Sequence, residues 1–457
     1  MSHIIVIGGG PAGMMAAGTA AAQGASVTLL EKNEKLGKKL HITGKGRCNL
    51  TNNTDIPGLM SNVISNPRFL HSAFHAMDSP ALMAFFEGRN VPLKTERGNR
   101  VFPVSDKADD INQALKAYLR AVGVKVELNR AVKGIEWDSS SGTKFIVKVS
   151  SQPTLAASAI IIATGGLSYP STGSTGDGFS WAMQLGHTIT PTSPSLVPLQ
   201  AQEPWIPALT GLSLKNVKCT LRLGKKVLYE ELGEMMFTPT GVTGPLVLSA
   251  SAYLPVITDA STPGRNPVHK LAHPEDIAPG HNLTSTSVNT TDHIPTHSQH
   301  PQPTISIDLK PGLTPDQLDT RLLRDFETHK NKDFCNALDG LLPQRLVDTI
   351  ITLSNIPPHK KIHTITRAER QSLAHLLKNL EIHPTGNQGY KEAVITKGGV
   401  STKEVNPSTL MSKHIPGLFF AGEMLDIDAL TGGYNMQIAF STGYLAGLSA
   451  AEYSNHT

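Results

Sequence analysis

Residues 2–31, SHIIVIGGGPAGMMAAGTAAAQGASVTLLE, decide the fold of this chain. The apolar run Ser2 to Ile7 predicts a short strand, and the small residues of Ala12 to Gln23 predict a helix that Gly24 ends. A second apolar run, Ser26 to Leu30, predicts another strand. The order strand, helix, strand is a βαβ unit, the opening unit of a nucleotide-binding α/β sheet.

The turn between the first strand and the helix has the spacing G-x-G-x-x-G, formed by Gly8, Gly10 and Gly13. The first glycine permits a tight turn, the second lets the backbone approach a pyrophosphate, and the third lets helix and strand pack closely. The helix N-terminus offers N–H groups and partial positive charge to phosphates. Glu31 follows about 20 residues later, where a carboxylate can accept hydrogen bonds from ribose hydroxyls. Together these features predict dinucleotide binding.

Composition excludes several classes of protein. The chain has 457 residues, enough for two or three domains, with 39% hydrophobic and 17% charged residues. A net charge of +4 is too small to indicate a nucleic-acid-binding protein, and apolar runs such as Ser158 to Ala163 are too short to span a bilayer. Cys48, Cys219 and Cys335 match no disulfide or zinc pattern, and no basic leader precedes the first strand. We expect a cytoplasmic protein without a metal site, and assign no oligomeric state.

The first third of the chain continues the α/β pattern. Helical spacing covers 109–122, and strands are expected at 124–128, 131–137, 144–149 and 156–163. The last of these is followed by Thr164-Gly165-Gly166, which is typical of a buried parallel strand that ends at a ligand. A stretch rich in proline, serine and threonine at 191–207 then indicates a crossing into another domain.

The middle of the chain changes character. Strands are expected at 217–223, 226–231 and 304–309, and helices at 315–328, 343–354 and 366–380. Residues 257–303 are dominated by Thr, Ser, Pro, His and Asn without periodicity, which predicts a surface insertion. Because its histidines are irregularly spaced, no metal site is predicted there. Strands at 392–396 and 417–421 and a helix at 435–451 then return to the α/β pattern.

This order predicts a Rossmann-like nucleotide domain that is interrupted and then resumed. The expected division is 1–190 for the first part of the nucleotide domain, 191–312 for a β-rich inserted domain, 313–383 for a helical segment and 384–457 for the second part.

Two further motifs point to the flat part of a flavin-like ligand. Gly417 to Glu423 is a buried strand ending in Gly-Glu, so a carboxylate lies at the carboxyl edge of the sheet. The run Thr431 to Asn435 leads into the last helix, whose N-terminus would stabilise negative charge on a reduced flavin ring; a purely structural N-cap at Asn435 is the alternative.

The loop Thr43 to Asn52, TGKGRCNLTN, combines glycines, cations and small polar residues. This loop would bind a phosphate of the cofactor, or it would be only a solvated basic loop. Cys48 within it has no second cysteine nearby, which excludes a C-x-x-C relay.

These motifs, with Thr396 to Val400 and Glu404 to Asn406, resemble the HI0933-like flavoproteins, also called the BaiN or YhiN family, over almost the whole chain. The resemblance implies a two-part FAD domain interrupted by a β-barrel-like domain and a helical piece. The chain departs from the family at Lys45, where a smaller residue is frequent, and at the insertion. Motifs and resemblance together predict these cofactor-binding residues: Gly8, Gly10, Pro11, Ala12, Gly13, Glu31, Lys32, Gly44, Gly46, Arg47, Cys48, Ala131, Val132, Ala163, Thr164, Gly165, Gly166, Gly422, Glu423, Asp426, Gly432, Gly433, Tyr434 and Asn435.

The predicted function is an FAD-dependent oxidoreductase, preferably a reductase of a small organic substrate. NAD(P)H would be a transient electron donor, since the chain has one full G-x-G-x-x-G motif. The resemblance leaves amine oxidation open. A flavin-dependent RNA-modifying enzyme and a non-enzymatic flavin-binding regulator are also compatible with these motifs. No proton donor is singled out; the candidates are His41, Tyr169, His187, His383 and Tyr434.

Overall fold

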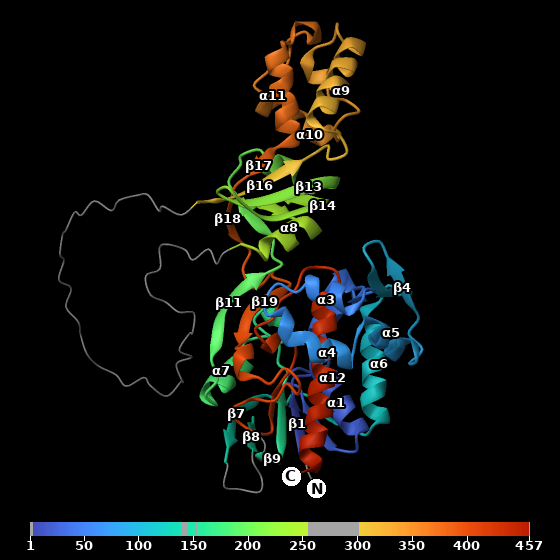
Figure 1. Cartoon of the computed structure of the whole chain (residues 1–457), viewed down its shortest axis with the longest axis vertical. Helices are drawn as coiled ribbons and strands as arrows, with labels where there is room; N and C mark the ends of the chain where they lie inside the picture. The colour runs from blue at the N-terminus through green and yellow to red at the C-terminus, as the bar shows by residue number, and fades with distance from the viewer. Residues whose placement is uncertain (1–2, 139–144, 151–152, 255–300, 457) are drawn as a thin grey trace, which may run out of the picture.

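The computed structural model describes residues 3–138, 145–150, 153–254 and 301–456. The predicted insertion at 257–303 lies outside this part of the chain except for its last three residues. Figure 1 shows three parts along the long axis: a nucleotide-type sheet with its helices, a second sheet, and a helical tip. Both chain ends lie at the bottom of the first part.

The first part is built on a five-stranded parallel sheet, which confirms the predicted α/β fold. Its strands are, in spatial order, β20 (Leu418–Phe420), β10 (Ala159–Ile162), β1 (His3–Ile7), β2 (Ser26–Leu30) and β6 (Lys125–Glu127). The expected strand at 156–163 is wrong in one respect. Ser158 donates its backbone N–H to the carbonyl of His3 at 2.9 Å and divides the run, so β9 (Leu155–Ala157) joins a different sheet from β10.

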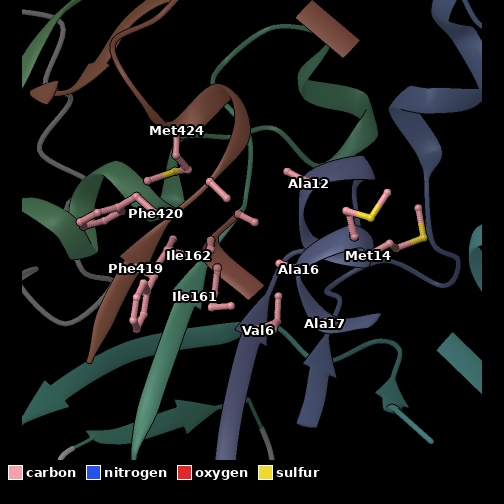
Figure 2. Close-up of a cluster of buried hydrophobic side chains, with 14 of the residues drawn as sticks. Val6, Ala12, Met14, Ala16, Ala17, Ile161, Ile162, Phe419, Phe420 and Met424 are labelled. Carbon is pink, nitrogen blue, oxygen red and sulfur yellow. The ribbon is translucent and has the colours of Figure 1, made fainter. Parts of the chain in front are cut away.

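Two long helices of small residues cross this sheet side by side: α1 (Pro11–Ala22) and α12 (Tyr434–Asn455). A Cβ at Gly443 would lie 2.3 Å from the Ala12 carbonyl oxygen, and one at Gly447 would lie 2.5 Å from that of Ala16. The two helices therefore approach at backbone distance and run in the same direction. Figure 2 shows the core beside them, where Val6, Ile161 and Phe419 come from neighbouring strands.

Shorter elements complete the first part. Its other helices are α2 (Lys38–Ile42), α3 (Ile56–Ser61), α4 (His71–Ala76), α5 (Ser79–Glu87), α6 (Ala108–Ala121) and α7 (Asp177–Gln184). Two small antiparallel sheets contain β3 (Thr51–Asn52), β5 (Arg100–Pro103) and β4 (Leu93–Glu96), and β7 (Val132–Trp137), β8 (Phe145–Val149) and β9.

An antiparallel pair, β11 (Ile189–Ser195) and β19 (Ile395–Val400), leads from the first part to the second. β19 starts three residues later than the expected strand at 392–396, because Glu392 and Ala393 instead donate their N–H groups to the Gly389 carbonyl in a turn. The proline-rich stretch after 191 is thus partly a strand rather than only a loop.

The second part is a seven-stranded sheet that curls on itself. Its strands are, in spatial order, β17 (Leu380–Ile382), β16 (Pro303–Asp308), β13 (Ser213–Leu223), β14 (Lys226–Thr238), β15 (Gly241–Thr243), β12 (Leu199–Ala201) and β18 (Pro384–Asn387). The two outermost strands, β17 and β18, are joined through His383 alone, so the sheet must bend until its edges meet. This confirms the predicted barrel-like character, and β13 and β14 are longer than expected.

Four helices accompany this sheet. α8 (Pro245–Ser251) packs on β14, and the helical tip contains α9 (Pro315–Thr328), α10 (Gln344–Ser354) and α11 (Arg367–Lys378). α9 and α11 begin with capping boxes at Thr314 and Thr366. No helix among the described residues is both long and apolar enough to cross a membrane.

Candidate functional site

A cavity of about 340 Å³ opens at the carboxyl ends of the parallel strands. The cavity is lined by the last residues of two strands, Ile7 of β1 and Leu30 of β2. It is also lined by Ala163 and Ala421, which directly follow β10 and β20. This is the edge at which open α/β sheets bind ligands. The sheet therefore places the glycine-rich turn and the Thr-Gly-Gly and Gly-Glu motifs around one space.

The N-termini of two long helices meet this cavity. Pro11 and Ala12 at the start of α1 line it, and so do Gly433 and Asn435 at the start of α12. Gly443 packs against Ala12, which is one residue into α1, and α12 begins nine residues before Gly443, at Tyr434. Its N-terminus therefore lies about 12 Å beyond that of α1. We call the region at α1 the nucleotide end and the region at α12, formed by Leu430 to Gly433 and Asn435, the far end.

At the nucleotide end, two positions of the glycine-rich turn have no room for a side chain. A Cβ at Gly8 would lie 2.5 Å from the Ala163 carbonyl oxygen, and one at Gly13 would lie 1.9 Å from the Gly8 carbonyl oxygen. A Cβ at Gly10, in contrast, would meet no atom within 4 Å. Gly8 and Gly13 thus bring strand and helix together, and Gly10 leaves open space in front of the α1 N-terminus. An extended pyrophosphate fits such a cradle.

Glu31 is 8% exposed and borders the cavity at the end of β2. Its Oε2 accepts the Gly9 N–H at 2.7 Å, and its Oε1 accepts the backbone and side-chain N–H groups of Asn33 at 2.8 and 2.7 Å. A carboxylate has about four acceptor sites, so roughly one remains for a ligand hydroxyl. The carboxylate fixes the glycine-rich turn and retains capacity for a ribose.

Glu423 lies in a polar cluster that the sequence did not reveal as a unit. Its Oε2 accepts from Lys39 Nζ at 2.6 Å, and its Oε1 accepts from Ser168 Oγ at 2.6 Å and from the Thr396 N–H at 2.8 Å. Lys39 also donates to Ser168 Oγ at 2.6 Å. The four residues come from four separate segments, and the side chains of Lys39 and Glu423 are only 20% and 19% exposed. The cluster carries balanced charge and holds the carboxylate at the cavity wall.

The far end is a loop held on both sides. Asn435 does not cap α12; its Oδ1 accepts the Ala429 N–H at 3.0 Å and its Nδ2 donates to the Ala429 carbonyl at 2.8 Å. From the other side, Leu430 donates its N–H to the Asn62 carbonyl at 2.9 Å. The cap position of α12 is Gly433, where a Cβ would lie 2.4 Å from the Thr51 carbonyl oxygen. The first N–H groups of α12 are thus presented to the cavity by a fixed turn.

Asp428 anchors the same loop from inside the protein. It is fully buried, and its carbonyl accepts the Ile64 N–H at 2.8 Å. Burial raises the pKa of its carboxyl above the usual range.

The loop Thr43 to Asn52 contributes less to the cavity than its sequence suggests. Gly44 lines it, but the Arg47 guanidinium makes ion pairs with Glu96 and Asp106 and lies 4.1 Å from the Phe102 ring centroid. Cys48 is fully buried, and burial raises the pKa of its thiol to about 12. Both side chains therefore serve local packing and charge balance.

The structure brings most of the predicted residues together at the cavity and leaves others outside its lining. Lining residues that the sequence predicted are Gly8, Gly10, Pro11, Ala12, Glu31, Lys32, Gly44, Val132, Ala163, Thr164, Gly165, Glu423, Gly432, Gly433 and Asn435. Predicted residues outside the lining are Gly13, Gly46, Arg47, Cys48, Ala131, Gly166, Gly422, Asp426 and Tyr434. Lining residues not predicted include Asn33, Lys39, Asn49, Arg130, Ser174, Asp177, Trp181, Leu196, Ile395, Ile427 and Thr431.

Three of the five candidate proton donors have side chains that contact other residues, and the two tyrosines lie outside the cavity lining. His41 contacts Asn112 at 2.8 Å, His187 contacts Ser412 at 2.8 Å, and His383 contacts Glu203 at 2.9 Å. Tyr169 does not line the cavity. Tyr434 is half-buried beside Gly432, outside the lining.

Comparisons with known proteins agree with this geometry. The family model for the HI0933-like protein Rossmann domain matches residues 2–449. A 3-dehydro-bile acid delta(4,6)-reductase of Clostridium scindens is 29% identical over 458 residues, covering 99% of this chain and 100% of the relative. Ribosomal RNA dihydrouridine synthases of Haemophilus influenzae and Escherichia coli are 29% and 28% identical and cover 98% and 96% of both chains in each pair. This chain belongs to the HI0933-like family and is an FAD-dependent oxidoreductase.

Proposed function

We propose that FAD lies along the cavity from the nucleotide end to the far end. The adenosine ribose would bind Glu31, the pyrophosphate would face Gly10 and the α1 N-terminus, and the flavin ring would face Gly432 and Gly433. The observation that supports this most is that two parallel helices, α1 and α12, direct their N-termini into one cavity about 12 Å apart along their axes. Each N-terminus would stabilise one anionic part of the cofactor.

We also propose that the chain divides at about residues 190, 312 and 383. Two separate hydrophobic cores support the boundaries near 190 and 383, and the boundary near 312 lies between β16 and α9. One core combines residues from Ile4 to Ala182 with residues from Val400 to Ala451, and the other extends from Leu199 to Ile382. In this division, the β-rich part would cover the far end, where a substrate would enter.

The reaction we propose is reduction of a carbon–carbon double bond conjugated to a carbonyl, with NAD(P)H as the electron donor. The flavin supplies the hydride when it is bound. Support comes from the names of the relatives, since a 3-oxo steroid alkene and the uracil ring share this bond arrangement. The lining near the far end includes Leu196, Ile395 and Ile427, apolar side chains that would exclude water from a flat substrate.

A small organic molecule is the substrate class that we favour, in a cytoplasmic enzyme. A net charge of +4 on 457 residues provides little general attraction for RNA. Ribosomal RNA is the second candidate, because two relatives of similar identity carry that activity in their names.

One experiment separates these candidate substrates. The FAD-loaded protein is reduced anaerobically with NADPH while the flavin absorbance is followed, and is then mixed with a 3-oxo-4-ene steroid or with a uridine-containing ribosomal RNA fragment. We expect bleaching by NADPH and recovery of the absorbance with the steroid. Recovery with RNA alone would make the second candidate correct. Bleaching by small amines but not by NADPH would favour an amine dehydrogenase and contradict the proposed reductase.

A further inference from the structure

A loop that follows β10 crosses the nucleotide end of the cavity. In the parallel sheet, β10 and β2 lie on either side of β1. Residues 172–177 come after β10, yet they contact Lys32 and Asn33, which follow β2 directly after Glu31. The loop therefore spans the end of β1, where the glycine-rich turn lies. We call residues 172–177 the covering loop. Its cavity-lining members are Thr172, Gly173, Ser174 and Asp177.

The inner part of the covering loop is attached beside Glu31. Asn33 Nδ2 donates to the Thr172 carbonyl at 3.1 Å and to Glu31 Oε1 at 2.7 Å. A Cβ at Gly173 would lie 2.5 Å from Asn33 Nδ2, and Gly173 has a φ of +106°, in the region that favours glycine. The backbone of the loop thus rests on the amide that orients the carboxylate proposed for the ribose.

The outer part of the covering loop is fastened by one lysine. Lys32 Nζ donates to Thr175 Oγ1 at 2.5 Å and to Asp177 Oδ2 at 2.7 Å. Thr175 Oγ1 in turn donates to Asp177 Oδ1 at 3.0 Å. We call Lys32, Thr175 and Asp177 the clasp. The side chains of Lys32 and Asp177 are 29% and 39% exposed, so the clasp lies at the protein surface.

The clasp does more than the stability of the fold requires. An ion pair this exposed contributes little to the stability of a protein, and the loop is already attached through Asn33. Gly173 and Gly176, with φ of +106° and +80°, flank the two residues between them. Glycines at both ends let such a segment move as a flap over a ligand site. The clasp therefore fixes the position of the loop over the cavity.

We propose that the clasp is a gate for FAD at the nucleotide end. While Lys32 is bonded to Thr175 and Asp177, the covering loop closes over the adenosine, and FAD passes this end only after these bonds break. The inference rests on the proposed placement of FAD with its ribose at Glu31. Because the clasp bonds join protein groups to each other, they resist both entry and release of the cofactor. Breaking them should change both rates together and leave the affinity nearly unchanged.

The test uses the full chain with Lys32→Met, with Asp177→Asn, and with the charge exchange Lys32→Glu plus Asp177→Lys. Lys125→Met is the matched control, because Lys125 pairs with Glu127 at 2.7 Å on the same sheet and neither residue lines the cavity. Release of FAD from the loaded protein is followed with an excess of apo-glucose oxidase, whose activity reports each captured FAD. Binding of FAD to the FAD-free chain is followed by stopped-flow flavin fluorescence, and urea unfolding confirms that each variant folds.

We expect Lys32→Met and Asp177→Asn each to raise the release rate and the binding rate of FAD by about fivefold, with a dissociation constant within about twofold of wild type, because the gate opens more often when the ion pair is lost. The charge exchange should return both rates towards wild type, and Lys125→Met should leave them unchanged.

Two results would overturn the gate while the proposed function stands. Faster release with an unchanged binding rate would show that Lys32 contacts FAD directly. Wild-type rates in both single variants would show that FAD passes through the far end. A wild-type chain that takes up no FAD would refute the proposed function and the gate together. Faster entry and release in the variants, with no enone reduction by the wild-type protein, would leave the gate standing and refute the proposed substrate.

Discussion

The two ends of the cavity are built in different ways. At the nucleotide end, one stretch from Gly8 to Glu31 supplies the turn, the helix N-terminus and the carboxylate. On the cavity wall, the polar cluster joins Lys39, Ser168, Thr396 and Glu423, and at the far end Thr431 contacts Ser249 of α8. The nucleotide end is therefore fixed by local backbone geometry, while the far end depends on contacts between distant segments.

The largest effect should come from Gly13→Ala at the nucleotide end. The new Cβ would have to displace the Gly8 carbonyl, which would otherwise lie 1.9 Å away. We expect a loss of about 3 kcal/mol in the free energy of unfolding, because overpacking of backbone against backbone cannot relax by a rotamer change. Urea unfolding measures it, and a variant as stable as wild type would contradict the described turn.

Gly10→Ala should separate cofactor binding from folding. Gly10 has an extended backbone conformation, and its Cβ would meet no protein atom within 4 Å, so the variant should fold with nearly wild-type stability. The methyl group would occupy the space proposed for the pyrophosphate, and FAD affinity should fall by about tenfold or more. Isothermal titration of the FAD-free protein gives both the affinity and the stoichiometry. Full FAD affinity would place the phosphates elsewhere.

On the cavity wall, the ion pair of Lys39 and Glu423 should show strong energetic coupling. Each partner is about four-fifths buried, so removing one leaves the other poorly solvated. In a double-mutant cycle with Lys39→Met and Glu423→Gln, we expect a coupling of about 2 kcal/mol in the free energy of unfolding. Each single variant should also retain less FAD after gel filtration. Additive effects would show that the cluster is not a unit.

The buried thiols of Cys48 and Cys219 should make the free energy of unfolding fall as the pH rises. Burial raises the pKa of Cys48 and Cys219 to about 12 from an ordinary 9.0, so the unfolded chain loses these protons first. Stability is present below pH 9 and is lost as the pH rises towards 12. Between pH 9 and pH 10 each thiol should contribute a decrease of about 1 kcal/mol in the free energy of unfolding. Cys48→Ala should flatten this decrease, and an unchanged slope would show that Cys48 is accessible to solvent.

The smallest effect should come from Arg47→Lys. Because the guanidinium is engaged with Glu96 and Asp106 outside the cavity lining, we expect FAD affinity to change by less than about twofold. A large loss of FAD would show that Arg47 reaches the cofactor, as the family resemblance implies.

The sequence predicted those parts of the cavity that are formed by residues close together in the chain. The glycine spacing, Glu31 and the strand that ends in Gly-Glu identified the cavity edge, because each depends on backbone geometry within a few residues. It failed for Lys39 and Ser249, whose partners Glu423 and Thr431 lie far away in the chain. The assignment of Cys48 to the cofactor site stays a prediction; Cys48 is fully buried and lies outside the cavity lining.

The central claim is that one FAD spans the cavity between the two helix N-termini. A crystal structure of the FAD complex tests it most directly. The account predicts the pyrophosphate at Gly10 and the flavin ring against Gly432 and Gly433, with the ring edge near Thr431. A ring that lies away from the α12 N-terminus, or a cavity that takes up no FAD at saturating concentration, would contradict it.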